Sequence, residues 1–183
     1  MSERSRQQIE QLAPDKTHVH VDFADVYRQH KLTIYRYILV RIGHVEDAHD
    51  LTAQVFLKAY QHNPTYRHEA PIVAWLIGIA RHQIVDYYRE QKPHIPLSEM
   101  NDFPTMGSSL EESVEQRNRL KRVAEALTVL SEDRREALAM RLFAGLKNQE
   151  IADLMGKSPD AVAMLVYRGV QDLKIRLSEE DNA

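Results

Sequence analysis

The chain has 183 residues, 43% of them hydrophobic, and a formal net charge of −3, which is enough material for one ordinary domain or two small ones. It contains no cysteine, which excludes a disulfide scaffold, a thiol nucleophile and a Cys-ligated metal site and suits a reducing cytoplasm. A protein that binds DNA unaided usually carries a basic excess, because phosphate neutralisation supplies most non-specific affinity, so the net charge argues against such a protein.

The N-terminal half reads as a polar leader followed by three helices. Residues 1–21 are polar without a sustained period, and neither a signal-peptide core nor an apolar run of about 18 residues is present, so we expect a flexible leader on a soluble cytoplasmic protein. Apolar residues recur at helical spacing over 23–42, where Gly43 ends the helix, and over 45–62. A loop is expected over 63–71, which prolines bound, and a third helix from 72 to about 92.

Composition changes at Pro93, and a second helical half follows. Residues 93–110 hold three prolines, a glycine and several serines, which indicates an extended linker. In the stretch 148–169, Gly156 supplies a left-handed helix end and Ser158 a cap for the next helix, the pattern of a helix-turn-helix. The sequence therefore predicts an all-α fold with two small helical domains, 22–92 and 111–178, and a helix-turn-helix in the second.

Three segments in order resemble the extracytoplasmic-function (ECF) sigma factors of the sigma-70 family. EDAHDLTAQVFLKAY (46–60) is similar to the family's polymerase-binding helix. PIVAWLIGIARHQIVDYYRE (71–90) carries the signature Trp-Leu followed by Ile-Ala-Arg, and residues 130–173 are similar to the C-terminal helix-turn-helix. The resemblance implies that one domain melts and reads the downstream (−10) promoter element and the other reads the upstream (−35) element. It also explains the net charge, because most of a sigma factor's surface meets the polymerase.

The resemblance and the local charge imply a set of residues for the −10 element. A positive face with aromatic side chains suits single-stranded DNA, because rings stack on unpaired bases and cations follow the phosphates. The loop after the second helix matches the family's loop that captures a flipped base. The alternative is that the tyrosines are core residues and the charges are merely solvated. The residues are Asn63, Tyr66, Arg67, Arg81, His82, Tyr87, Arg89 and Lys92. Trp75 is expected to support this surface from the core.

For the −35 element we expect the second helix of the helix-turn-helix to face DNA. Relatives commonly place Lys and Arg at positions matching Ala163 and Leu165, so bidentate contacts to guanine are not available there. We expect phosphates to be held by Lys157, Ser158 and Arg168. Base edges are then met by Asp160, Ala163, Met164, Tyr167 and Gln171.

One polar stripe is expected to bind the clamp region of the polymerase's largest subunit. It consists of Asp47, Asp50, Gln54 and Lys58, at i, i+3, i+7 and i+11 of the second helix. The family usually has Gln-Glu where this chain has Ala53-Gln54. The implied partners are RNA polymerase core, promoter DNA both duplex and melted, and an anti-sigma protein of the kind that restrains many relatives. No membrane, cofactor, metal or enzymatic activity is expected.

Two rival functions remain at this level. His44, Asp47, His49 and Asp50 contain the adjacent His-Asp pair of metal-dependent phosphohydrolases, although such sites need ligands from several elements. A stand-alone helix-turn-helix regulator with an N-terminal sensing or dimerising domain would account for the second half alone. It predicts duplex binding without polymerase, whereas the sigma hypothesis predicts that duplex binding needs the polymerase core.

Overall fold

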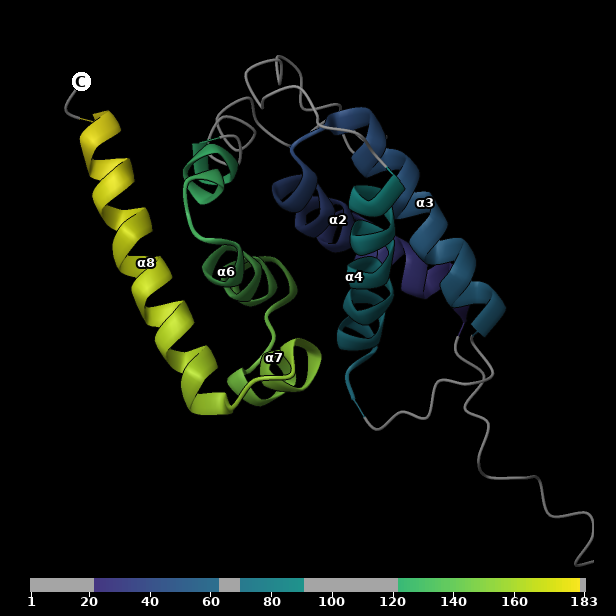
Figure 1. The fold of residues 1–183 in the computed structure, drawn as a ribbon. Coiled ribbons are helices and arrows are strands. Elements are labelled where there is room, and N and C mark those ends of the chain that lie inside the picture. The colour runs from purple at the N-terminus through teal and green to yellow at the C-terminus, as the bar shows by residue number, and fades with distance from the viewer. Residues whose placement is uncertain (1–21, 63–69, 91–121, 182–183) are drawn as a thin grey trace, which may run out of the picture.

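The computed structural model describes residues 22–62, 70–90 and 122–181, and every regular element in these ranges is a helix. The all-α prediction is therefore confirmed. The labelled elements are α2 (Phe23–Ile42), α3 (Val45–His62), α4 (Ile72–Glu90), α6 (Glu132–Ala144), α7 (Asn148–Met155) and α8 (Pro159–Asp181), and residues 122–128 are also helical (Figure 1). No helix in these ranges is long and apolar enough to cross a membrane.

Local chemistry ends several helices where the sequence predicts it. Gly43 has a φ of 74°, and its N–H donates to the Leu39 carbonyl over 2.7 Å, which closes α2. Gly156 has a φ of 64° and closes α7, and these left-handed positions suit glycine because it has no Cβ. The Ser158 hydroxyl accepts from the Ala161 N–H over 3.2 Å, as expected of the cap of α8.

The N-terminal unit consists of α2, α3 and α4, which pack against one another. Each helix contributes fully buried aliphatic side chains, among them Ile34 and Ile38 of α2, Val55 of α3 and Leu76 of α4. Trp75 is partly buried and packs against this core, as expected. Burying these faces removes apolar surface from water, which is the main force that assembles the unit.

The C-terminal unit contains α6, α7 and α8, with α8 packed on both other helices. Gly169 lets α8 approach α6 closely, since a Cβ at this position would lie 2.6 Å from Leu138 Cδ1. Val162 on the inner side of α8 is fully buried, as are Ile151 of α7 and Leu138 of α6. The long α8 thus keeps one side for packing and leaves the other outside.

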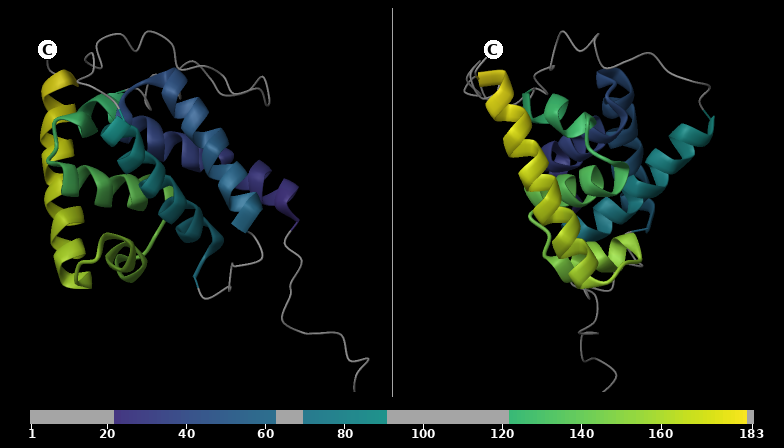
Figure 2. Two further views of the ribbon diagram at one scale, coloured as in Figure 1. Left: turned by 45° about the vertical axis from the view of Figure 1, so that its right-hand side comes forward. Right: turned by 60° about the vertical axis from the view of Figure 1, so that its left-hand side comes forward.

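The two units pack against each other. Figures 1 and 2 show α6 between α8 and the N-terminal helices, and α6 contacts α2 and α4 while α7 contacts α4. The buried apolar residues of both units form one continuous cluster. The sequence predicts two helical domains but gives no sign of this association, which we call the closed arrangement.

Candidate functional site

The outer face of α8 carries most residues expected to read the −35 element. Met164 and Tyr167 are 47% and 61% exposed. Polar and charged side chains lie three or four residues away from them on the same face of the helix. Ala163 lies at the edge of this face and is only half-buried. The exposed members are Asp160, Met164, Tyr167, Arg168 and Gln171. A helix with one packed side and one free side of this length fits a major groove.

The turn before α8 places Lys157 and Ser158 beside that face. Lys157 Nζ lies 3.0 Å from Asp133 Oδ2 of α6, so this cation already has a carboxylate partner. On α6 and α8, Arg134 pairs with Asp172 over 2.6 Å, which braces the two helices. Charge pairs therefore join α8 and the turn before it to α6, in addition to apolar packing.

Four of the residues expected at the −10 element lie in α4. His82 is exposed, and its Nδ1 lies 2.8 Å from the Gly78 carbonyl. Arg89 is exposed and pairs with Asp86 over 3.0 Å. The Tyr87 hydroxyl donates to Asp47 of α3 over 2.6 Å, while Arg81 turns toward the C-terminal unit. The others, Asn63, Tyr66, Arg67 and Lys92, lie outside the described residues.

The four residues of the expected polymerase stripe on α3 differ in their exposure. Asp47 is half-buried, accepts from Tyr87 and lies 3.1 Å from His44 Nδ1. The remaining members, Asp50, Gln54 and Lys58, are exposed along one face of the helix. Leu57, which sequence reasoning did not select, is 58% exposed beside them. A single exposed leucine is common on protein surfaces, so Leu57 alone does not mark an interface.

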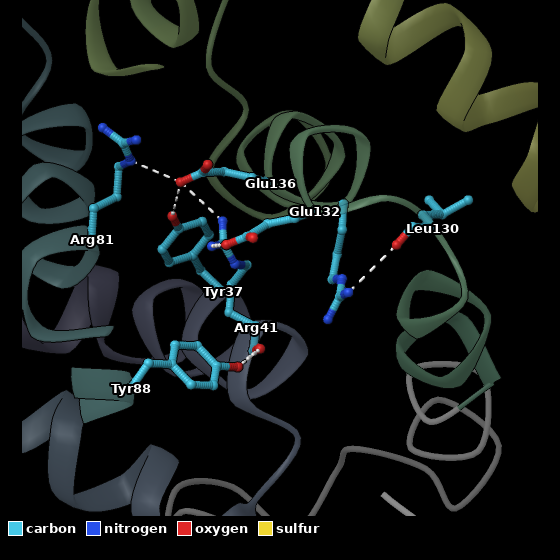
Figure 3. A network of polar contacts seen from close by, with 8 residues as sticks. Tyr37, Arg41, Arg81, Tyr88, Leu130, Glu132 and Glu136 are labelled. Atoms are coloured by element: carbon cyan, nitrogen blue, oxygen red, sulfur yellow. Dashed lines mark hydrogen bonds and ion pairs between the residues drawn. The ribbon is translucent and has the colours of Figure 1, made fainter. Parts of the chain in front are cut away.

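A buried polar network joins the two units and was not predicted (Figure 3). Glu136 of α6 is 7% exposed, and three groups of the N-terminal unit converge on its Oε1. Arg81 Nε donates to it over 2.7 Å and the Tyr37 hydroxyl over 3.3 Å, while Arg41 Nη1 lies at ion-pair distance, 2.9 Å. Buried charges of this kind are retained only when they are paired, because desolvation is otherwise too costly.

Further contacts extend this network. Arg41 Nη2 donates to Glu132 of α6 over 3.0 Å, and Arg81 Nη1 donates to the Leu154 carbonyl of α7. The Tyr88 hydroxyl donates to the Arg41 carbonyl over 2.6 Å. The only sequence sign was Glu136 itself, which shares a helix face with the buried Met140 four residues later.

Protonation states in the network follow from burial and charge. Burial raises the pKa of the Tyr37 hydroxyl, and the neighbouring Glu136 carboxylate raises it further, so this tyrosine stays neutral and donates. Burial alone would lower the pKa of the Arg41 guanidinium, but the adjacent Tyr37 and the two glutamates raise it. The cation therefore persists inside the interface.

The metal-site hypothesis finds no support in its own residues. His49 stacks on Tyr35 with ring centroids 4.5 Å apart, and Asp47 is engaged by Tyr87. Across the described ranges, no three His, Asp or Glu residues gather as metal ligands would. Asp50 lies on the exposed side of α3.

Comparison with known proteins gives two family matches. Residues 26–94 match the family model described as sigma-70 region 2, and residues 120–173 match the one described as sigma-70, region 4. The ECF RNA polymerase sigma factor BldN of Streptomyces coelicolor is 32% identical over 162 residues, which cover 87% of this chain and 61% of BldN. The ECF sigma factor SigM of Bacillus subtilis is 27% identical, over 82% of this chain and 91% of SigM.

Solved structures share the fold. The sigma factor RpoE of Bartonella quintana, in complex with the anti-sigma factor NepR, aligns with a TM-score of 0.67 at 19% identity, over 86% of this chain and 97% of RpoE. CnrH, in complex with the cytosolic domain of CnrY, aligns with a TM-score of 0.63 at 21% identity, over 86% of this chain and 88% of CnrH. At these identities the likeness concerns the fold alone.

Proposed function

The chain belongs to the ECF sigma factors of the sigma-70 family, and from this premise we propose how its parts share the work of promoter recognition. As an RNA polymerase sigma factor, it binds the polymerase core and directs transcription initiation at specific promoters. Its role is non-enzymatic, since it supplies positioned surfaces while the polymerase supplies the chemistry. Polymerase acts in the cytoplasm, where we therefore place the protein.

The observation that carries this proposal is the free outer face of α8. Met164, Tyr167 and Gln171 are exposed along it, so apolar and polar side chains can meet base edges in the major groove. Arg168 beside them and Lys157 at the turn supply cations for the phosphates. The face lacks arginine at the base-reading positions Ala163 and Leu165, so we propose a reader that depends on shape and apolar contact.

The N-terminal domain, 22–92, contributes the polymerase and −10 contacts. We propose that Asp50, Gln54 and Lys58, with Leu57 at their centre, dock on the clamp region of the largest subunit. The end of α4 and the loop 63–69 contact the melted strand. Residues 93–110 then act as the linker to the domain 111–178, and residues 1–21 as the leader. An anti-sigma protein is a further partner, which is supported by the fold shared with RpoE, a sigma factor solved in complex with the anti-sigma factor NepR.

A stand-alone regulator accounts for the helix-turn-helix but leaves the region 2 match over 26–94 without a role. The two functions differ in what they need from the polymerase. A stand-alone regulator binds its duplex site alone, whereas a sigma factor with a net charge of −3 needs the core to supply most of the phosphate contacts.

Reconstituted transcription tests the proposal. Purified protein is combined with polymerase core on a library of promoters with randomised −35 and −10 elements, and initiated transcripts are sequenced. We expect a selected promoter class, and no shift of the same duplexes by the protein alone. Failure to stimulate any initiation, together with no binding to core, would contradict the assignment.

A further inference from the structure

The closed arrangement cannot span a promoter. The −10 and −35 elements are centred about 25 base pairs apart, which is roughly 85 Å of B-DNA at about 3.4 Å per base pair. A domain of about 70 residues is only about 30 Å across, so two such domains in contact reach about 60 Å at most. Here the contact is direct, with Arg81 Nε 2.7 Å from Glu136 Oε1. The units must therefore separate before both elements are read.

We propose that Glu136 is an interdomain latch that holds the protein closed until polymerase core separates the two units. This inference rests on the proposed function for the promoter span, for the −10 contact of Arg81 and for naming the core as the agent of release. The latch consists of one carboxylate from α6 and the side chains of Tyr37, Arg41 and Arg81 from α2 and α4. All four come from helices that the structure describes in full (Figure 3).

The latch also withholds a cation from DNA. Arg81 directs Nε to Glu136 and Nη1 to the Leu154 carbonyl, so both groups serve the C-terminal unit. A carboxylate and a phosphate oxygen offer a guanidinium the same kind of charge-assisted acceptor. Glu136 therefore binds the Arg81 guanidinium that the −10 strand would contact, and separation of the two units makes this guanidinium available.

A buried ion cluster gives the closed arrangement its definite geometry. Apolar packing between α2 and α6 is less directional than the two hydrogen bonds and one ion pair that meet at a single Glu136 oxygen. Loss of the carboxylate would leave the buried Arg41 guanidinium next to the partly exposed Arg81 guanidinium, with only the exposed Glu132 as a counter-charge, which is costly. Core polymerase releases the latch if it binds the separated units and not the closed ones, because a ligand shifts an equilibrium only by its differential affinity.

Because the chain contains no cysteine, two introduced cysteines can be labelled specifically. Gln61→Cys on α3 and Lys174→Cys on α8 place one exposed label on each unit, and single-molecule energy transfer then reports the separation of the units in the full chain. Glu136→Gln keeps the side-chain shape and removes the charge. We expect its low-transfer, open population to rise roughly tenfold or more over the unmodified latch, the order for losing a buried charge-assisted hydrogen bond.

Glu132→Gln is the matched control, because Glu132 pairs with the same Arg41 but is 75% exposed, and exposed pairs contribute little. We expect its transfer distribution to stay near that of the parent. An unchanged distribution for Glu136→Gln, with normal helical circular dichroism, would overturn the latch. If Glu136→Gln loses helix, Arg81→Lys is the second test variant, since one ammonium cannot reproduce the fork that bonds both Glu136 and Leu154. A closed population of Arg81→Lys as large as the parent's would then overturn the latch.

Adding polymerase core separates this inference from the proposed function. The parent protein should shift to low transfer as it binds core, and Glu136→Gln should bind core more tightly, because a larger fraction of it is already open. Core binding with high transfer retained would overturn the latch as the step that core releases. No core binding by any variant would contradict the proposed function, while the transfer measured without core still decides whether Glu136 holds the units together.

Discussion

At the scale of single residues, two buried tyrosines of α2 show how differently one side chain can be used. Tyr35 is 4% exposed, and its hydroxyl has no partner within the described residues. The Tyr37 hydroxyl, fully buried, donates to Glu136 over 3.3 Å. A buried hydroxyl without a hydrogen bond destabilises the folded state, whereas a bonded one contributes to it.

Tyr35→Phe should therefore raise the free energy of unfolding at neutral pH by about 1 kcal/mol. Burial raises the pKa of Tyr35 from 10.0 to about 12, so the folded state favours the neutral phenol. This preference for the neutral phenol adds its full contribution to the free energy of unfolding below pH 10. The contribution declines as the pH rises toward 12, because the Tyr35 hydroxyl of the unfolded chain ionises first. Phe cannot ionise, so the variant should lose less stability over that window.

Urea unfolding at pH 7 and pH 11 measures both effects. Tyr37→Phe is the control and should be less stable than the parent at pH 7; equal changes in the two variants would contradict the reasoning.

A second prediction at the scale of single residues concerns the outer face of α8. Tyr167 is 61% exposed, so Tyr167→Ala should leave the melting temperature almost unchanged. If its ring meets base edges, holoenzyme affinity for a promoter with an intact −35 element should fall by about 1–3 kcal/mol. Competition binding against a promoter with a scrambled −35 element supplies the control. An equal loss on both promoters would mean that Tyr167 contacts no base.

At the scale of helices, two glycines give opposite expectations for the same change. A Cβ at Gly169 of α8 would lie 2.6 Å from Leu138 Cδ1, so the fully buried Leu138 would have to shift within the core. A Cβ at Gly78 of α4 would lie 3.5 Å from Leu154 Cδ2, an ordinary contact. Gly169→Ala should cost about 1–3 kcal/mol through overpacking, whereas Gly78→Ala should add up to about 1 kcal/mol of helix propensity. Chemical unfolding of both variants tests this, and a stabilised Gly169→Ala would show that α6 and α8 are not so close.

Helices are also where sequence reasoning succeeds and fails most clearly. Apolar periodicity and end signals such as Gly43 and Ser158 are local, so they predict the bounds of α2 and the start of α8 correctly. The bond between Tyr37 and Glu136 joins positions 99 residues apart, and no local pattern encodes it. Arg81 illustrates the result: its type and spacing indicate a DNA contact, but its partners in the closed arrangement come from the other unit.

At the scale of the whole molecule, one continuous core joins the two units, although each unit matches its own family model. Proteins whose parts share a core unfold together, because opening one part exposes the apolar surface of the other. Differential scanning calorimetry of the parent protein should therefore give one transition with equal calorimetric and van't Hoff enthalpies. Glu136→Gln should keep the shared apolar core but lower the van't Hoff enthalpy below the calorimetric one, because the weakened contact couples the two units less tightly. Glu132→Gln, which alters an exposed pair, should keep the single transition. Two transitions in the parent would mean that the contact between α6 and α2 is too weak to couple the units, and α6 would then be free to carry α8 to the −35 element without any release step.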